Sequence, residues 1–396
     1  MHVSQMSLEK MNAAKPGAPT APNRPSNTIE QVKLLVSRLE GRFTEIASIA
    51  GLISDISKHT KMLSFNATIE SARAGQAGRG FAVVASEVRA LAERTSEATS
   101  DINRMLQDVN TEIVGAVKDV ETAEVETLIQ GGIRIATLES AKLEILFTRI
   151  ATVIHGFKQT LQGLSLSSEA LTRQTIDNVM AEYLRRNEDL LALSCCALPN
   201  VIDGADINFV NAPGHDGTGR YIPYWNRGSG QIQLEPLTGY DTPGLNDWYE
   251  LPRKAGRDVM IEPYDYPVAG RTVKITSLMS PFTLKGVFAG VVGTDYALER
   301  LQADLARVKP FNVGALILLS NSAAYVAHPD PEQLGKTAQD LSFDAKAAIR
   351  AGLPYQYTDD AGIARIFHPL KIGEDTHPWS VMVRFEIVSA LRNGSR

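Results

Sequence analysis

The sequence predicts a long antiparallel coiled-coil hairpin of α-helices, followed by an α+β domain whose sheets are mainly antiparallel. The first observation is a heptad pattern of apolar residues on both sides of a glycine-rich stretch near residues 75–80. The second is a change of composition at about residue 200, where Tyr, Trp, Pro and Gly become frequent and apolar runs shorten to strand length. Together they indicate a helical first part and a sheet-containing second part.

The composition is that of an ordinary globular protein of two or three domains. The 396 residues are 44% hydrophobic and 21% charged, and the net charge of −5 gives no general reason to expect nucleic acid binding. No run of about 18 apolar residues occurs, and the N-terminus lacks the apolar segment of a secretory signal. We therefore expect a cytoplasmic location.

Residue types that carry enzyme chemistry do not form a recognisable motif. The sequence has no metal-ligand spacing, no nucleophile motif and no glycine-rich phosphate loop, and His328 and His368 stand alone. The only two cysteines, Cys195 and Cys196, are adjacent, and adjacent cysteines rarely form a disulfide. We expect packed thiols, structural histidines, no metal, no cofactor and no enzyme activity.

The first 111 residues divide into a tail and the hairpin. Residues 1–27 are rich in Pro, Ala, Asn and Ser and are predicted to be disordered, and a helix is expected to start at Ser26–Thr28. In the hairpin, residues 28–111, two apolar seams step by three and four residues. The first seam consists of Val32, Val36, Leu39, Phe43, Ile46, Ala50, Ile53, Ser57 and Thr60. The second consists of Val84, Val88, Leu91, Thr95, Ala98, Ile102, Met105 and Val109.

Glycines between the two seams allow the chain to reverse. Gly75, Gly78 and Gly80 tolerate the positive φ angles that a tight connection between antiparallel helices needs. One hairpin cannot bury two seams by itself, so we expect a homodimer that forms a four-helix bundle.

Residues 112–164 are predicted to form a helical connector, with a break or bend at Gly131-Gly132. A further helix is predicted over Ser165–Leu193. In the second half, strands are predicted within GRYIPYW, TVKITSLMS, VFAGVVGTDYAL and VGALILLS, and helices over Ala297–Val308 and Asp340–Ala351.

The segment Thr60–Thr95, with the sequence TKMLSFNATIESARAGQAGRGFAVVASEVRALAERT, resembles the signalling tip of methyl-accepting chemotaxis proteins. The resemblance implies that the tip docks a chemotaxis histidine kinase and a coupling adaptor, and that dimers associate into trimers. The contact residues carried over by the motif are Phe65, Asn66, Ile69, Glu70, Arg73, Arg79, Phe81, Val83, Val84, Glu87 and Arg89.

Residue chemistry at the tip agrees with an interface. Glu70 and Arg73 are three residues apart and can pair on one helical face, and Ile69, Phe81 and Val83 would form an apolar patch. The alternative interpretation is that side chains such as Phe65, Val84, Val88 and Leu91 fill the coiled-coil core and that the charged residues are simply solvated.

The tip departs from the family pattern in three ways. Gln76 stands where the family has Glu, Ser64, Thr68 and Ser71 replace the commoner alanines, and the arms of the hairpin are short. Because no pair of Glu or Gln flanked by small residues is evident, adaptation by methylation is not expected.

Residues 165–396 resemble a double Cache sensor domain, also called PDC-like, with a distal module at about 200–308 and a second module at about 309–396. The resemblance rests on Gly219–Arg227, Asp247–Pro252, Glu262–Gly270, Ser277–Phe282, Gly290–Leu298 and, in the second module, Gly314–Lys336. It implies a small-molecule site in the distal module, at or near Tyr221, Tyr224, Trp225, Trp248, Tyr249, Tyr264, Tyr266 and Asp295.

The residues at this implied site favour a cationic ligand. Where amino-acid-binding members have an arginine before the Trp-Tyr pair, this sequence has Asn246, whereas the aspartate, Asp295, is present. Aromatic rings with one carboxylate suit an amine or quaternary ammonium group. Taken singly, each Tyr or Trp has a core-packing role as its alternative.

Because the hairpin precedes the sensor, the chain is predicted to be a cytoplasmic chemotaxis signal transducer that reads an internal metabolite. We expect ligand closure to shift the helix at 165–193 and to act through residues 112–162 on the hairpin. Three alternatives stay open: a ligand-binding scaffold or ligand sink that has lost kinase coupling, an enzyme, and a fragment of a longer membrane receptor.

Overall fold

The computed structural model describes residues 27–166, 172–373 and 376–393. The tail predicted over residues 1–27 lies outside the described residues, except for Asn27, which begins the first helix. The chain divides into two compact units, one up to Thr122 and one from Ala123 to Gly394, and each is described by itself.

The first unit is the predicted hairpin. Helix α1 spans Asn27–Arg73, the 3₁₀ turn η1 spans Gly75–Gly78, and helix α2 begins at Arg79 and ends at Ser165. Gly75 has φ of +56°, and a Cβ atom on Gly78 would lie 2.2 Å from the carbonyl oxygen of Ser71. The reversal therefore requires glycine at these two positions.

The interior of the hairpin is a stripe of small residues with a strict seven-residue spacing. We call this set the small-residue stripe; it consists of Ala50, Ser57, Ser64, Ser71, Gly78, Ala85, Ala92 and Thr99, all of them buried. Its serine hydroxyls donate to carbonyl oxygens of their own helix, as Ser64 does to Lys61 at 2.8 Å and Ser71 to Ala67 at 2.8 Å. The serines that depart from the family pattern are therefore accommodated without unpaired hydroxyls.

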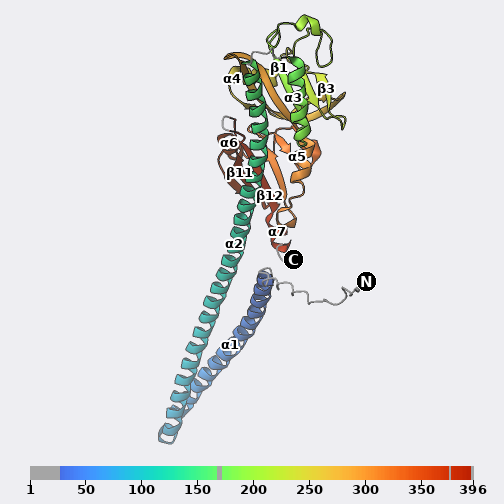
Figure 1. The fold of residues 1–396 in the computed structure, drawn as a ribbon. Helices are drawn as coiled ribbons and strands as arrows, with labels where there is room; N and C mark the ends of the chain where they lie inside the picture. The colour runs from blue at the N-terminus through green and yellow to red at the C-terminus, as the bar shows by residue number, and fades with distance from the viewer. Residues whose placement is uncertain (1–26, 167–171, 374–375, 394–396) are drawn as a thin grey trace, which may run out of the picture. The chain divides into compact units, whose positions relative to one another are not determined.

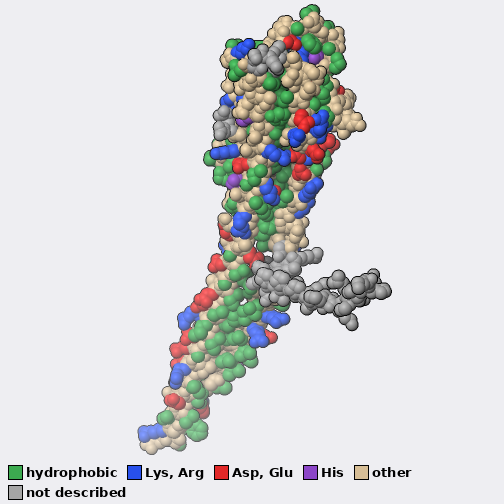
Figure 2. Space-filling model, in the orientation of Figure 1, with side chains coloured by type: hydrophobic (Ala, Val, Ile, Leu, Met, Phe, Trp, Pro, Cys, Tyr) green, Lys and Arg blue, Asp and Glu red, His purple; other side chains and the backbone are tan. Residues whose placement is uncertain are grey.

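Most of the large apolar side chains of the predicted seams lie outside this interior. Val84 is 59% exposed, Leu91 63% and Met105 61%. Figure 2 shows hydrophobic side chains gathered along the hairpin. Within a single hairpin Val84, Val88 and Leu91 are exposed, because the small-residue stripe fills the interior. Their place in the core of a dimeric coiled-coil bundle stays a prediction.

The second unit contains two antiparallel sheets. The first has the order β3-β2-β1-β7-β6-β4, and β5 also pairs with β6. Its strands are β1 (Ala192–Ala197), β2 (Pro223–Asn226), β3 (Gln233–Pro236), β4 (Val259–Met260), β5 (Tyr264–Val268), β6 (Arg271–Leu284) and β7 (Val287–Ala297). Its helices are α3 (Arg173–Arg186), η2 (Asp206–Phe209), α4 (Asp247–Ala255) and α5 (Leu298–Leu305).

The second sheet has the order β10-β11-β12-β8-β9. Its strands are β8 (Ala315–Leu319), β9 (Tyr325–Ala327), β10 (Tyr355–Thr358), β11 (Ile363–Leu370) and β12 (Trp379–Glu386). Its helices are η3 (Pro310–Asn312), η4 (Pro331–Gln333), α6 (Phe343–Ala351) and α7 (Ile387–Asn393). The predicted α+β class with antiparallel sheets is confirmed.

The C-terminal part of α2 runs alongside both sheets (Figure 1). Phe147 and Ile150 belong to the core formed with the second sheet, whereas Phe157 and Leu161 pack with residues of the first sheet and α3. At about 25 cal/mol per Å² of apolar area, these buried side chains stabilise the docking of α2 substantially.

Of the break or bend predicted at Gly131-Gly132, the break is wrong, because α2 continues through both glycines. A Cβ atom on Gly132 would lie 2.3 Å from Cδ1 of Ile366, and one on Gly131 would lie 3.1 Å from the Phe311 ring. The two glycines let the second sheet and η3 approach the helix closely.

The predicted helix Ser165–Leu193 is shorter than expected. Helix α3 begins at Arg173, after Thr172 caps it by accepting a hydrogen bond from the Thr175 backbone N–H, and it ends at Arg186. Leu193 instead belongs to β1, in which all six residues are buried. The two cysteines of β1 are free and buried, as predicted, and burial raises the pKa of Cys196 to about 12.

None of the helices in the described parts of the chain combines the length and apolar content needed to cross a bilayer. Among the described residues, no group of three or more His, Cys, Asp or Glu side chains is arranged to hold a metal ion.

Candidate ligand cavity and signalling tip

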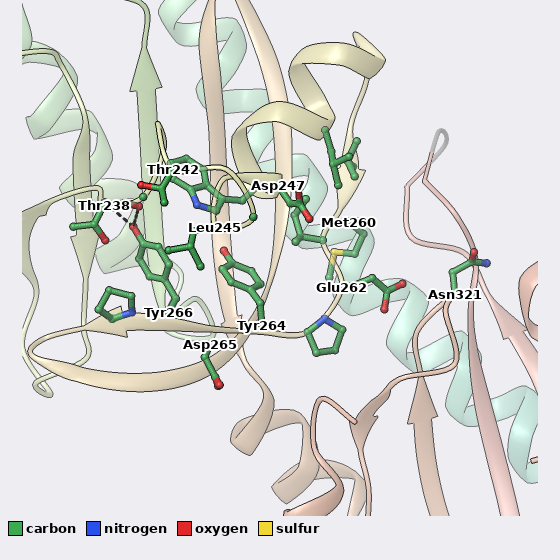
Figure 3. Close-up of a pocket in the computed structure, with 18 of the residues that line it drawn as sticks. Thr238, Thr242, Leu245, Asp247, Met260, Glu262, Tyr264, Asp265, Tyr266 and Asn321 are labelled. Atoms are coloured by element: carbon green, nitrogen blue, oxygen red, sulfur yellow. Dashed lines mark hydrogen bonds between the residues drawn. The ribbon is translucent and has the colours of Figure 1, made fainter. Parts of the chain in front are cut away.

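A cavity of about 720 Å³ lies between the first sheet and residues of the second module. Its walls come from the loop before α4, from α4 itself, and from β4, β5 and the residues between these strands, and Asn321 reaches it from the second module (Figure 3). His377 and Trp379 of the second module also line it. We call it the aromatic cavity, because Trp248, Tyr264 and Tyr266 line it.

Local sequence positions these three rings. In α4, Trp248 and Tyr249 are buried, and the helix ends at Gly256 in the left-handed conformation, with φ of +64°. In β5, Tyr264 and Tyr266 point to the same side and Asp265 to the other, as strand alternation requires (Figure 3). Edge-to-face contacts hold the rings: the centroid of the Tyr266 ring lies 6.4 Å from that of Trp248 and 6.0 Å from that of Tyr264.

A buried polar network lies behind the tyrosines and is centred on Asp295 of β7. The Tyr224 hydroxyl donates to Oδ2 of Asp295 at 2.6 Å, and the Ser277 hydroxyl donates to Oδ1 at 2.6 Å. The hydroxyls of Ser277 and Tyr264 lie 2.9 Å apart. Asp295 does not line the aromatic cavity itself. It accepts hydrogen bonds from Tyr224 and Ser277, and Ser277 in turn contacts Tyr264, which lines the cavity.

Burial raises the pKa of Asp295 to about 6, although the hydrogen bonds from Ser277 and Tyr224 lower it. As pH rises, the unfolded chain, with an aspartate pKa near 3.9, loses this proton at a lower pH than the folded protein does. The free energy of unfolding should accordingly fall as pH rises from about 4 to about 6, by about 3 kcal/mol from this group.

Replacing Asp295 by asparagine should remove this pH dependence, because the amide cannot ionise. We expect the free energy of unfolding of Asp295→Asn, relative to wild type, to increase between pH 4 and pH 7.5. Thermal or urea unfolding of the full chain at both pH values measures the difference. The matched control is Asp241→Asn in the exposed loop before α4, which should keep the pH dependence of the wild type. If Asp241→Asn gained stability relative to wild type over this pH range as much as Asp295→Asn, the assignment would be contradicted.

The structure brings together only part of the predicted ligand site. Trp248, Tyr264 and Tyr266 line the cavity, and Tyr224 lies behind them on Asp295. Tyr249 instead faces Arg220, whose Nη2 atom lies 3.1 Å from the Tyr249 hydroxyl.

Tyr221 and Trp225 are on the helix side of the first sheet. The Tyr221 hydroxyl donates to Oδ1 of Asp177 at 3.0 Å, and Nε1 of Trp225 donates to the same oxygen at 3.2 Å. Since side chains alternate across β2, Tyr224 and Trp225 cannot both face the cavity.

Three acidic residues that line the cavity were not among the predicted site residues. Glu262 accepts hydrogen bonds from the backbone N–H and hydroxyl of Ser322, and Asp265 pairs with Lys274 at 3.0 Å. Asp247 makes no hydrogen bond or ion pair through its side chain with any described residue. No Lys or Arg is among the described residues that line the cavity, so Asp247 gives it an available negative charge.

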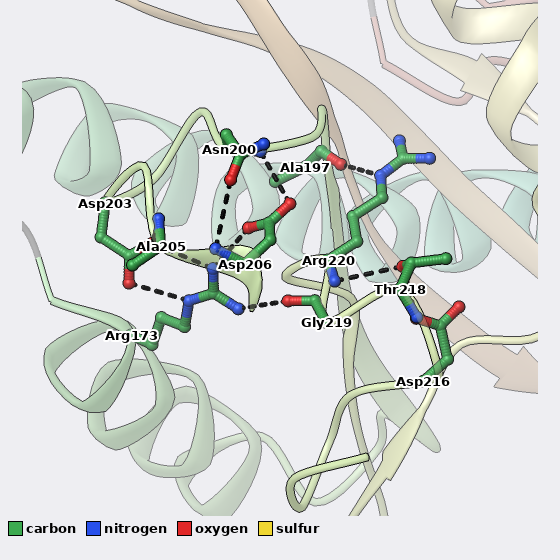
Figure 4. A network of polar contacts seen from close by, with 10 residues as sticks. All are labelled: Arg173, Ala197, Asn200, Asp203, Ala205, Asp206, Asp216, Thr218, Gly219 and Arg220. Atoms are coloured by element: carbon green, nitrogen blue, oxygen red, sulfur yellow. Dashed lines mark hydrogen bonds and ion pairs between the residues drawn. The ribbon is translucent and has the colours of Figure 1, made fainter. Parts of the chain in front are cut away.

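A buried arginine organises the loop that leads into β2 (Figure 4). The Arg173 side chain is 3% exposed and pairs with Asp203 at 2.9 Å and with Asp206 at 2.5 Å. It also donates to the Gly219 carbonyl oxygen at 2.7 Å and lies 4.0 Å from the centroid of the Phe209 ring. This node ties the start of α3 to residues 198–220 and was not anticipated from the sequence.

The eleven predicted contact residues of the tip are all exposed in the hairpin. Phe81 is the most exposed of the apolar ones, at 75%. The predicted pair of Glu70 and Arg73 is present, with Oε2 and Nη1 3.5 Å apart. Their use as partner contacts stays a prediction.

Comparison with known proteins agrees with both parts of the fold. Residues 10–188 match the methyl-accepting chemotaxis protein signalling domain. Residues 176–303 match the first PDC sensor domain of methyl-accepting chemotaxis protein-like proteins. The chain therefore carries a chemoreceptor signalling domain and a PDC sensor domain. Proteins of this family are signal transducers rather than enzymes, in agreement with the sequence-based expectation.

Curated relatives match only part of this chemoreceptor-type chain. It is 37% identical over 123 residues to the methyl-accepting chemotaxis protein McpP of Pseudomonas putida, a match that covers 31% of this chain and 23% of McpP. The matches to the first curated relatives thus span about a quarter or less of each relative's own length.

Solved structures match about two thirds of the chain. The extracellular domain of mmHK1S-Z3, described as a histidine kinase, is 26% identical with a TM-score of 0.60, and the match covers 67% of this chain and 97% of that one. Methyl-accepting chemotaxis protein X is 25% identical with a TM-score of 0.57, covering 67% of this chain and 99% of that one. The predicted PDC-like sensor fold is confirmed.

Proposed function

We propose that this chain is a chemotaxis signal transducer in which a ligand in the aromatic cavity controls a histidine kinase through the hairpin tip and a coupling adaptor. The observation that carries the proposal is helix α2, which is unbroken from the glycine turn to Ser165 and packs on both sheets. A change in the sensor sheets can therefore act directly on a helix that is also part of the hairpin.

This route differs from the one predicted through the helix at 165–193. Phe147 and Phe157 of α2 contact the two sheets without an intermediary, and Lys158 donates to the Ser280 hydroxyl of β6 at 2.9 Å. The His155 ring nitrogen Nε2 also lies 2.5 Å from Oδ2 of Asp258, next to β4. Ligand-dependent movement of β4, which borders the aromatic cavity, would reach α2 through these contacts.

A homodimer is part of the proposal. The small-residue stripe fills one hairpin, while the large apolar side chains of the seams lie on its surface. A second hairpin would cover them and form a four-helix bundle, which removes apolar area from water. The exposed tip would then dock the kinase and adaptor, and the dimers would associate further into trimers.

Co-sedimentation of the full chain with the histidine kinase and coupling adaptor of the same organism tests the coupling. We expect a ternary assembly whose kinase activity differs from that of kinase and adaptor alone. If neither partner is retained, the alternative of a ligand-binding scaffold without kinase coupling, to which the Gln76 departure points, is favoured instead.

The ligand we propose is an organic cation, an amine or a quaternary ammonium compound. Trp248, Tyr264 and Tyr266 offer aromatic faces, and Asp247 offers a carboxylate without a partner among the described residues. Cation–π attraction and charge pairing act together in such a site, each contributing on the order of 1 kcal/mol or more where water is excluded. Asp295 would act indirectly, by holding Tyr224 and Ser277 in place.

A thermal-shift screen of the full chain tests the ligand class, with amines, betaines, amino acids, purines and organic acids as candidates. We expect cations to give the largest rise in melting temperature that depends on residues of the aromatic cavity. Ligand binding raises the melting temperature by mass action. The variant Asp247→Asn should weaken cation binding about tenfold, which corresponds to roughly 1.4 kcal/mol. Asp241→Asn, which changes an exposed aspartate outside the cavity, should leave the affinity unchanged; equal losses in both variants would refute the site.

The cytoplasmic location stays a prediction. Fractionation of cells with an antibody against the chain tests it.

A further inference from the structure

A second cavity, of about 570 Å³, lies in the second module. Its walls come from β9, the loop around η4, the segment before α6 and β12. The ionisable and aromatic residues that line it are Tyr325, His328, Asp330, Lys336, Asp340 and Arg384.

The two acidic residues of this cavity are already engaged by the protein. Asp330 accepts hydrogen bonds from the Glu332 backbone N–H at 3.0 Å and from Nε2 of Gln333 at 3.2 Å. Asp340 accepts a hydrogen bond from the Tyr325 hydroxyl, and its Oδ2 lies 3.6 Å from Nη2 of Arg365. Their negative charge is therefore partly used within the module.

The two basic residues have no direct contact of this kind with any described residue, although hydrogen bonds from Gln333 and Glu332 and the nearby positive charge of Lys336 together lower the pKa of Asp330. Within the described parts of the chain, the side chains of Lys336 and Arg384 make no hydrogen bond or ion pair. Arg384 of β12 stands directly opposite Arg365 of β11 in the strand register, and like charges in that position repel each other. Arg365 is compensated by Asp359 at 2.5 Å and by Asp340, whereas Arg384 has no such partner.

We propose that this second cavity binds a small anion that carries a carboxylate group. A guanidinium group can hold a carboxylate through two parallel hydrogen bonds, and the lysine ammonium adds a second positive charge. The rings of Tyr325 and His328, with centroids 4.6 Å apart, form an adjoining wall. This site is separate from the aromatic cavity and selects the opposite charge, so it does not depend on the proposed cation site.

Isothermal titration of the full chain with succinate at low ionic strength tests the proposal. We expect saturable binding, at least tenfold weaker in Arg384→Gln and also weaker in Lys336→Gln, whose position is exposed and tolerant of substitution. The matched control is Lys285→Gln, which removes the same charge from an exposed turn and should bind like wild type. Asp247→Asn should also leave succinate binding unchanged.

Three results would overturn the inference. The first is no succinate binding up to about 10 mM, a limit that corresponds to about −3 kcal/mol. The second is equal weakening by Arg384→Gln and Lys285→Gln, which would mean that only net charge matters. The third is inorganic phosphate that binds the same site more tightly than succinate, which would contradict the carboxylate assignment.

Discussion

Replacing Arg173 by alanine is expected to lower the free energy of unfolding of the sensor unit by about 3–5 kcal/mol. The guanidinium is buried between Asp203 and Asp206 and also bonds the Gly219 carbonyl oxygen. Its removal takes the positively charged donor from the two carboxylates, which keep backbone N–H donors from Asn200 and Ala205, and leaves the Gly219 carbonyl group without this bond. The loss is large because the remaining charges stay behind, not because the ion pair itself is strongly stabilising.

A surface ion pair on the same helix supplies the control. Arg186 pairs with Glu182 at 2.6 Å, but the arginine side chain is 77% exposed, so Arg186→Ala should change stability by less than about 1 kcal/mol. Thermal unfolding of the full chain should show the sensor transition of Arg173→Ala roughly 10 °C below wild type. Melting temperatures that agree within the error for both variants would show that the node is not needed for stability.

Replacing Phe81 by alanine is expected to weaken assembly with the kinase and adaptor at least tenfold. Phe81 is 75% exposed at the tip, so its removal should hardly change the stability of the hairpin. Exposed aromatic side chains are frequent energetic centres of protein interfaces. The effect should therefore appear in binding and in kinase activity, and not in the melting curve.

Phe343 allows a matched comparison, since it is 84% exposed but lies at the start of α6 in the sensor unit. Phe343→Ala removes the same side chain from the same chain and should leave co-sedimentation with kinase and adaptor unchanged. An unchanged assembly in Phe81→Ala would argue against the tip as the docking surface.

Local sequence patterns were sufficient for the hairpin and for the strands that carry clear apolar runs. The heptad spacing and the glycines at 75–80 predicted two helices and a turn, and both are present. The sequence did not predict that, within one hairpin, the small residues of the seams would be buried and most of the large ones exposed. Ala50 and Ser57 face inward while larger neighbours face outward, since helices joined by a short turn pack closely through small side chains.

The errors have tertiary causes. A Gly-Gly pair within a helical pattern normally signals a break, but Gly131 and Gly132 lie where Phe311 and Ile366 press against α2. The strand ALSCCA has no polar alternation because both of its faces are buried, so the sequence pattern places its first two residues, Ala192 and Leu193, at the end of the predicted helix.

The candidate site was predictable only where it lies within motifs. Trp248, Tyr264 and Tyr266 were found because they belong to quoted motifs, and Asp247 stands in the same stretch as Trp248. Asn321 and His377 reach the aromatic cavity from a distant part of the sequence, and no local pattern marks them. The side of the sheet that Tyr221 and Trp225 face depends on the strand register, which the sequence alone does not specify.

The most direct test of the central claim is kinase autophosphorylation in the reconstituted assembly of full chain, kinase and adaptor, titrated with the cation that binds most tightly in the screen. We predict a change in kinase rate that is half-complete near the measured Kd and that shifts to about tenfold higher concentration in Asp247→Asn. A cation that binds the aromatic cavity at the same Kd but leaves the kinase rate unchanged in an intact assembly would contradict the claim that this cavity controls the tip.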